Sequence, residues 1–325
     1  MRKMFLWIAA ASAFAAIAVV VVTWIAYLTD MREAHERISG KSAVVATPYG
    51  DVEYTEGGIG PDVLVIHGAG GGYDQGELMV EAVLSDRFHW IAPSRFGYLR
   101  STFREGASYD DQAHAYDSLL DELGVSRVAV VGLSAGGPSA LLFALLYPDR
   151  VSSLTLLSCG VAPRVTETQK EADKKGRALV GIFKRDASYW LLSKLFRKRL
   201  MTLMGVTETV IGDLDADQLS WCDRFIEYMN PASVRYEGAV FDNTRPLPGD
   251  RIAGIRAPTF IVHAEDDTLQ LFDNAAFAAT TIPHARLLRF ENGGHFVIII
   301  EQDTVREAVQ RHIVENAREL LPDSP

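Results

Sequence analysis

A serine between glycines is the residue of this sequence best suited to act as a nucleophile. Ser134 stands in the pentapeptide Gly-Leu-Ser-Ala-Gly, after the apolar run 127–131 and before the apolar segment 138–147. These flanks predict a buried strand followed by a helix. A sharp turn between them lifts a serine hydroxyl clear of the sheet, and glycines two residues before and after the serine avoid a steric clash. The N-terminus of the helix favours negative charge developing at Ser134.

A nucleophilic serine needs a base within hydrogen-bond reach. Of the eight histidines, His67, His263 and His295 follow predicted strands, and catalytic groups of open α/β sheets gather at such ends. His295 comes after two glycines, which let its loop place the imidazole over the serine, so we predict that His295 is the base. We expect His67 to hold its own loop and His263 to pack at its strand end.

The base in turn needs an acid that fixes its tautomer. An acidic cluster follows the predicted strand 258–263, and within it Asp267 is our first choice, Asp266 the second and Glu265 the third. The alternative interpretation is a solvated acidic turn.

A glycine-rich loop, residues 67–72, follows another predicted buried strand. It lacks the third glycine of a dinucleotide fingerprint and the Gly-Lys-Ser/Thr of a phosphate-binding loop, which excludes both nucleotide interpretations. Backbone N–H groups of such a loop can bind an oxyanion together with the N–H of the residue after the nucleophile, here Ala135. We predict Ala69 as the second donor, with Gly70 as the alternative.

The elements that must position these residues alternate between strand and helix. This alternation over residues 43–160 predicts a mostly parallel sheet flanked by helices, the α/β class. It stops over residues 161–245, which are helical in pattern, and resumes over 246–325 with a last helix at 304–321. We therefore expect a helical cap inserted between two parts of one α/β core.

The N-terminus carries a long apolar run. Residues 4–28 hold no charged side chain and suffice for a membrane-spanning helix, so we predict an anchor at 1–28 and a short helical tether at 29–42. Arg2 and Lys3 before the run favour a cytoplasmic N-terminus and a catalytic body on the non-cytoplasmic side. The alternatives are a signal peptide, cleaved to release a secreted protein, and a buried helix of a soluble protein.

Composition narrows the classes of partner. The formal net charge of −10 over 325 residues argues against nucleic acid, which needs a basic surface. The two cysteines, Cys159 and Cys222, form no metal-ligand spacing. Their apolar surroundings favour unpaired thiols, and a Cys159–Cys222 bridge in an oxidising compartment is the alternative. A small hydrophobic ester or acyl compound is the expected substrate.

With these motifs in place, the chain resembles the α/β-hydrolase fold enzymes that carry a helical cap. The resemblance covers roughly residues 44–320, and its nucleophile, acid and base follow in the order Ser134, Asp267, His295. It rests on the His67-Gly68 loop, the segment 94–98, the Ser134 turn, residues 264–267 and Gly294-His295. The resemblance implies that no metal or organic cofactor is required.

Carboxylesterases and meta-cleavage-product hydrolases are the similar branches, and motifs do not separate them. An ester hydrolase is our first hypothesis and a C–C bond hydrolase of dienoic ring-fission products the second. A non-catalytic binder that kept the pocket is the third. A haloalkane dehalogenase is excluded because that branch needs an aspartate nucleophile where this chain has Ser134.

The predicted cap interleaves basic and apolar residues. Its basic face could be a solvated surface, could rest on anionic lipid headgroups beside the anchor, or could supply one Arg or Lys to a substrate carboxylate. The residues concerned lie between Lys174 and Met204.

Overall fold

The architecture is that of a computed structural model, which describes residues 2–162 and 166–318. An eight-stranded sheet has the order β1-β2-β4-β3-β5-β6-β7-β8. All neighbours from β4 to β8 pair in parallel, and only the β1–β2 and β2–β4 pairs are antiparallel. The sheet is therefore mostly parallel, as the sequence predicts. The strands are β1 (Ala43–Thr47), β2 (Gly50–Gly57), β3 (Asp62–Ile66), β4 (His89–Pro93), β5 (Val128–Leu133), β6 (Val151–Leu157), β7 (Thr259–Ala264) and β8 (Arg286–Phe290).

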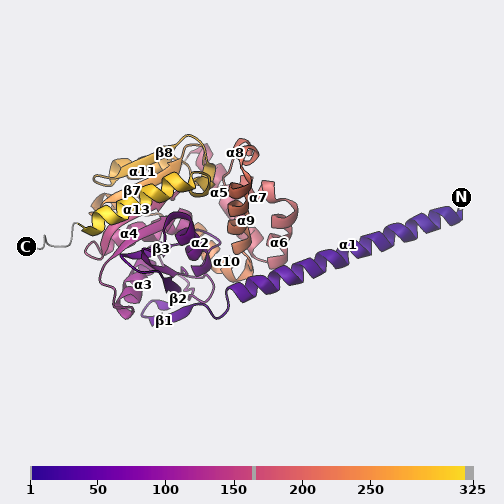
Figure 1. The fold of residues 1–325 in the computed structure, drawn as a ribbon, viewed down its shortest axis with the longest axis horizontal. Helices are drawn as coiled ribbons and strands as arrows, with labels where there is room; N and C mark the ends of the chain where they lie inside the picture. The colour runs from indigo at the N-terminus through magenta and orange to yellow at the C-terminus, as the bar shows by residue number, and fades with distance from the viewer. Residues whose placement is uncertain (1, 163–165, 319–325) are drawn as a thin grey trace, which may run out of the picture.

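Helices cover both faces of the sheet (Figure 1). Helices α2 (Tyr73–Val83) and α13 (Gln302–Arg318) pack on one face, and α3 (Tyr109–Glu122), α4 (Gly137–Leu146) and α11 (Asp273–Thr281) pack on the other. Strand β5 shows how each face is covered. Ala129 and Val131 pack in the core under α2 and α13, while Val128 and Val130 pack in the core under α3, α4 and α11. A strand whose successive side chains enter two apolar cores must be apolar throughout.

The segment between β6 and β7 is helical. It contains α5 (Glu167–Phe183), α6 (Asp186–Leu195), α7 (Arg197–Leu203), α8 (Glu208–Asp213), α9 (Ala216–Tyr228) and α10 (Tyr236–Thr244), with the short 3-10 helices η2 (Ser233–Arg235) and η3 (Gly249–Gly254) near and after its end. We refer to residues 166–245 as the cap helices. Figure 1 shows them gathered at one end of the sheet, on the side from which the N-terminal helix projects.

Helix α1 (Arg2–Arg37) runs without a break through the apolar segment and the charged residues after it. Its length and a mean hydropathy of 2.6 in its most apolar window suffice to cross a membrane, and that window makes no contact that buries it. Only the C-terminal part of α1 packs on the body, where Met31 and Ala34 are buried with Trp190 of α6. The part of α1 that follows the apolar run is therefore docked on the cap helices through one of its faces.

Some elements differ from the sequence-based expectation. The sequence did not lead us to α2, which contains Gly76, a poor helix former. The close packing of α2 on β4 explains this glycine, because a Cβ there would lie 2.7 Å from the Cβ of Ala92. Cys159 and Cys222 are buried and unpaired, as predicted. Residues 319–321 of the predicted last helix and 163–165 of the predicted cap lie outside the described residues.

Candidate active site

Ser134 lies at the turn between β5 and α4, in the 3-10 helix η1 (Ser134–Gly136). Its φ of +50° is a left-handed conformation that a non-glycine residue adopts only under constraint. The neighbouring glycines make the turn possible. A Cβ at Gly132 would lie 2.9 Å from the Cβ of Ala140, and one at Gly136 would lie 2.5 Å from the carbonyl oxygen of His67. The glycines predicted from the motif are therefore required by close packing.

Ser134, His295 and Asp267 form one hydrogen-bonded chain. His295 Nε2 lies 2.8 Å from Ser134 Oγ, and His295 Nδ1 lies 2.7 Å from Asp267 Oδ2. All three side chains are buried. Residues that are 161 and 28 positions apart in the sequence thus meet at the carboxyl ends of β5, β7 and β8. This arrangement can remove a proton from Ser134 Oγ and stabilise the resulting imidazolium.

The other two acidic residues of the cluster are engaged elsewhere. Asp266 accepts a hydrogen bond from the Gly294 N–H at 2.7 Å, and Glu265 pairs with Arg289 at 2.6 Å. Asp266 thereby fixes the loop that carries His295. Only Asp267, our first choice, contacts the imidazole.

Asp267 is surrounded by donors. Its Oδ1 accepts from the N–H groups of Leu269 (2.8 Å) and Gln270 (2.9 Å). His263 Nε2, which donates to the Gln270 carbonyl at 2.6 Å, lies 3.5 Å from Asp267 Oδ2. Burial alone would raise the pKa of Asp267, but the charge of His295 and the hydrogen bonds from His263 and His295 hold that pKa below its usual value. The carboxylate is therefore ionised whenever the imidazole needs a counter-charge.

The glycine-rich loop lies against the serine, and the Cβ of Ser134 is 3.2 Å from where a Cβ of Gly68 would stand. The N–H of Gly68 donates to Gln75 Oε1 (3.0 Å) and the N–H of Gly70 donates to the Tyr98 hydroxyl (3.3 Å). Within the described residues, the N–H of Ala69 donates no hydrogen bond. Ala69 also lines the cavity at Ser134, together with Ala135. Of the two candidates in the loop, Ala69 is the one with a free donor.

A buried ion pair between Arg95 and Asp242 holds the glycine-rich loop in place. Arg95 donates to both carboxylate oxygens of Asp242 in α10, at 2.5 and 2.7 Å, and to the carbonyl oxygens of His67 (2.9 Å) and Gly68 (3.1 Å). His67 Nε2 accepts from the Arg95 N–H at 2.9 Å, and its Nδ1 lies 2.7 Å from the Gly68 carbonyl oxygen. Burial and the neighbouring Arg95 charge lower the pKa of His67 well below its ordinary value. His67 is thus a neutral imidazole that holds the loop.

A second buried pair fixes the end of the same loop. Arg235 of η2 donates to both oxygens of Asp74 (2.9 and 2.7 Å) and to the carbonyl oxygen of Gly71 (2.6 Å). Arg37, the last residue of α1, adds a bond from Nε to Asp74 Oδ2 at 3.3 Å. The loop is therefore held between the sheet, the cap helices and the N-terminal helix.

Gly205, between α7 and α8, brings the cap helices against Asp267 and His295. Its carbonyl oxygen accepts from the N–H groups of His295 and Thr268, both at 3.4 Å. Its φ is +90°, and a Cβ there would lie 2.9 Å from Asp267 Oδ1 and 3.0 Å from His295 Cβ. Only glycine fits this position without displacing the pair.

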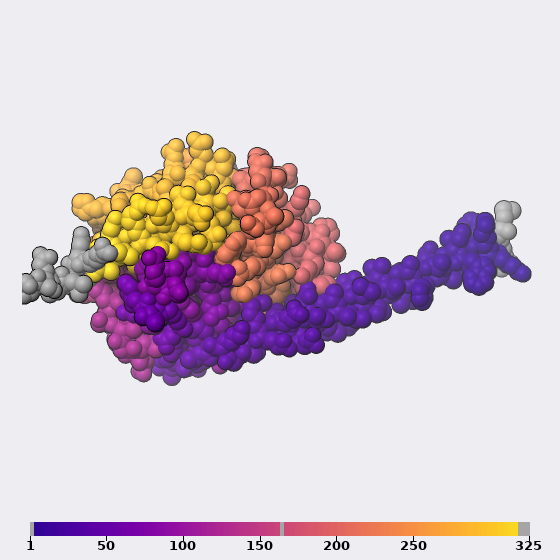
Figure 2. Space-filling view, in the orientation of Figure 1, coloured from indigo at the N-terminus to yellow at the C-terminus, as the bar shows by residue number. Residues whose placement is uncertain are grey.

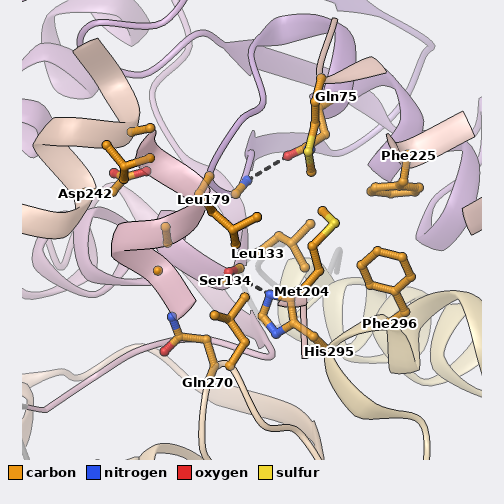
Figure 3. A pocket seen from close by; sticks show the side chains of 18 of the residues that line it. Gln75, Leu133, Ser134, Leu179, Met204, Phe225, Asp242, Gln270, His295 and Phe296 are labelled. Carbon is orange, nitrogen blue, oxygen red and sulfur yellow. Dashed lines mark hydrogen bonds between the residues drawn. The ribbon is translucent and has the colours of Figure 1, made fainter. Parts of the chain in front are cut away.

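An apolar cavity of about 130 Å³ opens on Ser134 and His295 (Figure 3). Figure 3 shows Leu179, Met204 and Phe296 around the serine and the imidazole. Among the described residues that line this cavity there is no Lys or Arg. The alternative in which a cationic side chain of the cap reaches into the pocket is therefore not supported by the described lining of this cavity.

A second, more polar cavity of about 310 Å³ adjoins the first. The two share Ala135, Asp242 and Gln270. Arg177 of α5 and Arg245, directly after α10, line the second cavity. The cations that could meet a bound substrate, Arg177 and Arg245, therefore lie in the adjoining cavity and not in the one that contains Ser134.

Comparison with known proteins decides the family. A family model described as "Alpha/beta hydrolase family" matches residues 63–308, which is most of the chain. The chain belongs to the alpha/beta hydrolase family. Within it, the 2-hydroxy-6-oxononadienedioate/2-hydroxy-6-oxononatrienedioate hydrolase of Burkholderia vietnamiensis is 27% identical over 75% of this chain and 84% of its own length.

Solved structures share the alpha/beta hydrolase fold at lower identity. A thermophilic esterase from Thermogutta terrifontis has a TM-score of 0.66 and 20% identity, covering 85% of this chain and 99% of that one. A bacterial membrane phospholipase A, described as a virulence factor, has a TM-score of 0.66 and 20% identity. It covers 98% of this chain and 100% of its own.

The sequence did not lead us to the two buried ion pairs. Arg95 and Asp242 are 147 residues apart, and Arg235 and Asp74 are 161 apart. We had noted the segment 94–98 only as part of the family resemblance, and nothing local distinguishes Asp242 or Asp74 from a surface acid. Such partners become visible only when the chain is folded.

Proposed function

We propose that this alpha/beta hydrolase is a serine hydrolase that cleaves carboxylic esters through an acyl-enzyme on Ser134. The observation that carries the proposal is the chain of hydrogen bonds from Ser134 through His295 to Asp267. Ser134 Oγ attacks the acyl carbon while His295 takes its proton, and Asp267 orients the imidazole and stabilises its charge. His295 then returns the proton to the leaving alcohol, and water releases the acid by the same steps in reverse.

The oxyanion that forms during attack needs donors. We assign this role to the N–H groups of Ala69 and Ala135, because Ala69 has a free N–H in the described chain and the N–H of Gly70 is already bound to Tyr98. Loss of one such donor typically raises the barrier by about 2.7–4 kcal/mol. None of these steps requires a metal or an organic cofactor.

The apolar cavity favours an ester over a C–C substrate. Dienoic ring-fission products are carboxylates, whereas the lining at Ser134 carries no Lys or Arg among its described residues. A buried carboxylate without a cation is costly. An uncharged acyl group, in contrast, is stabilised by contact with Leu179, Met204 and Phe296.

C–C bond hydrolysis is the second candidate, and two observations favour it. The relative from Burkholderia vietnamiensis is named for such a dioate substrate. Arg177 and Arg245 line the adjoining cavity, where they could pair with a carboxylate. A third possibility, a binder without catalysis, has no support in the hydrogen-bonded chain at Ser134.

A parallel assay separates the candidates. We expect the full chain in detergent to hydrolyse p-nitrophenyl esters, with a preference among acyl-chain lengths, and to leave a dienoic ring-fission product intact. Ser134→Ala should remove the ester activity. Activity on the ring-fission product without activity on esters would assign the second function instead.

We also propose that α1 is an uncleaved single-pass anchor with the catalytic body on the non-cytoplasmic side. In support, residues 27–37 pack on the cap helices and belong to the same unbroken helix as the apolar segment. We expect mass spectrometry of the membrane fraction to find a chain with its N-terminus intact. We also expect added protease to digest the body only from the non-cytoplasmic side of the membrane. A chain that begins after residue 28 would identify a cleaved signal.

A further inference from the structure

Exposed apolar side chains are concentrated on helix α6 and the turn after it. Outside α1, six large hydrophobic side chains of the described chain are exposed, and three of them are Leu191, Leu195 and Phe196. Leu195 is 65% exposed and Phe196 is 54% exposed. Single exposed apolar residues are ordinary, but a cluster indicates a surface that meets an apolar partner.

The same segment is strongly basic in an acidic protein. Residues 187–207 contain four basic residues and no acidic one, whereas the whole chain has a net charge of −10. Lys194 and Arg197 pair with carboxylates of the protein. Lys198 and Arg199 are exposed and have no ion pair among the described residues. Two unpaired cations therefore stand directly beside the exposed Leu195 and Phe196.

Helix α1 holds this segment in a fixed orientation. Trp190 Nε1 donates to Asp30 Oδ2 at 2.8 Å, and Lys194 Nζ lies 3.0 Å from the same oxygen. The ring of Tyr27 meets the ring of Trp190 edge-on, with centroids 5.4 Å apart. Helix α6 thus lies against the part of α1 that follows its apolar stretch.

The height of α6 relative to a bilayer follows from these contacts. Residues 4–25 of α1 would span about 33 Å at 1.5 Å per residue, close to the roughly 30 Å hydrocarbon core of a bilayer. Trp24 and Tyr27 come at the end of this stretch, and such aromatic residues prefer the membrane interface. The contact between Tyr27 and Trp190 therefore places α6 at the level of the lipid headgroups. Figures 1 and 2 show α6, α7 and their surface on the side of the body toward which the free part of α1 extends.

We propose that this face, defined by Leu191, Leu195, Phe196, Lys198 and Arg199, rests on the anionic surface of a membrane, an inference that rests on the anchor role proposed above for α1. The apolar side chains enter the interface, and the two cations pair with lipid phosphates. A lipid surface is favoured over a second copy of the chain because the face continues the apolar stretch of α1 and carries unpaired positive charge.

The cap residues on either side of this face line the cavity at Ser134. Phe183, at the end of α5, and Met204, directly after α7, line that cavity, while Lys198 and Arg199 of α7 face outward. The segment that meets the lipid therefore lies in the chain between two residues that line the pocket, Phe183 and Met204, without lining it itself. An acyl chain leaving the bilayer would meet the cap helices first.

Fluorescence of the full chain in vesicles tests the proposal. A polarity-sensitive probe is attached to Leu195→Cys and, as a control, to Thr280→Cys on α11, an exposed position away from α1. The native cysteines are buried, and wild-type chain treated with the same probe serves to check that they do not react. Vesicles contain lipids with a quenching group near the headgroup and either phosphatidylglycerol or phosphatidylcholine. We expect strong quenching at position 195 in phosphatidylglycerol, weaker quenching in phosphatidylcholine or at high salt, and little quenching at position 280.

A charge-reversed variant completes the test. Lys198→Glu with Arg199→Glu should lower the docked-to-undocked ratio by at least about fivefold per residue. The measurement is repeated on Ser134→Ala, so that its outcome does not depend on the catalytic proposal. Equal quenching at positions 195 and 280, or cross-linking of position 195 to a second chain without lipid quenching, would overturn the membrane-docking proposal.

Discussion

Arg37, the last residue of the N-terminal helix, bonds to the buried carboxylate of Asp74 at the start of α2, with Nε 3.3 Å from Oδ2. Asp74 also receives two bonds from Arg235, which itself holds the Gly71 carbonyl. One carboxylate therefore joins the helix that could cross a membrane, the cap helices and the loop beside Ser134. The proposed anchor is part of the support of the proposed oxyanion loop.

The two arginines should differ in their effect on stability. Arg235→Met removes a fully buried partner and leaves Asp74 with only the 3.3 Å bond from Arg37 and the 3.1 Å bond from the Gln75 N–H, which typically costs about 3–5 kcal/mol. Arg37→Met leaves the bidentate pair intact and removes the bonds of a partly exposed side chain to Asp74 and to the carbonyl oxygens of Tyr228 and Asn230, so we expect a smaller loss of about 1–2 kcal/mol. Thermal unfolding in detergent measures both. Equal losses would contradict the assignment of Arg235 as the main partner.

Glycine at position 205 should be required by the acid–base pair. Gly205→Ala places a Cβ within 3.0 Å of both Asp267 Oδ1 and His295 Cβ, at a φ that alanine disfavours. We expect a loss of about 1–3 kcal/mol of stability and at least a tenfold lower kcat on a p-nitrophenyl ester. Gly212→Ala in α8 is the matched control, because no described atom of another segment lies within 4 Å of the added Cβ. Wild-type kcat in Gly205→Ala would show that the cap turn does not position the pair.

Substitution of Asp267 should lower kcat far more than substitution of its neighbour Asp266. Asp267→Asn keeps the size of the side chain but favours the wrong tautomer of His295, and the same change in a serine triad lowers kcat by about 10⁴. Asp266→Asn keeps an oxygen that can accept from the Gly294 N–H, so its kcat should stay within about threefold of wild type. Steady-state kinetics on one ester compares them. A larger loss in Asp266→Asn would exchange the two roles.

The low pKa of His67 predicts a loss of stability in acid. In the unfolded chain an imidazole takes up a proton below about pH 6.5, whereas buried His67 does so only at lower pH. The unfolded state therefore binds more protons, and the free energy of unfolding falls by up to about 1.4 kcal/mol per pH unit as pH drops below 6.5. His67→Gln should lose stability at pH 7.5 but show a shallower decline toward pH 5. An unchanged slope in that variant would mean that His67 does not stay neutral in the folded protein.

The sequence predicted the layout of the sheet and the residues that meet at Ser134 because these signals are local. The strand 128–133 is apolar on both faces, and the glycines around Ser134 and before His295 mark turns that few other residues can form. Choosing Asp267 rather than Asp266 was harder, since adjacent carboxylates differ only in which way the folded loop turns them.

The supports of the site could not be predicted in the same way. Arg95 and Arg235 are ordinary basic residues in the sequence, and burial makes them important only after β4, α10 and η2 have come together. Helix α2 was not predicted because Gly76 disfavours a helix, and the reason for a glycine there is the close packing of α2 on Ala92 in the folded protein. Propensity describes a segment alone, and these features depend on contacts between segments.

Covalent labelling of Ser134 tests the central claim most directly. The full chain in detergent is treated with a fluorophosphonate, and the modified peptide is identified by mass spectrometry while residual p-nitrophenyl ester hydrolysis is followed. We predict one label per chain, located on Ser134, with activity lost in proportion to labelling and both absent in Ser134→Ala. Ester hydrolysis at the wild-type rate in Ser134→Ala, or in fully labelled protein, would contradict the account.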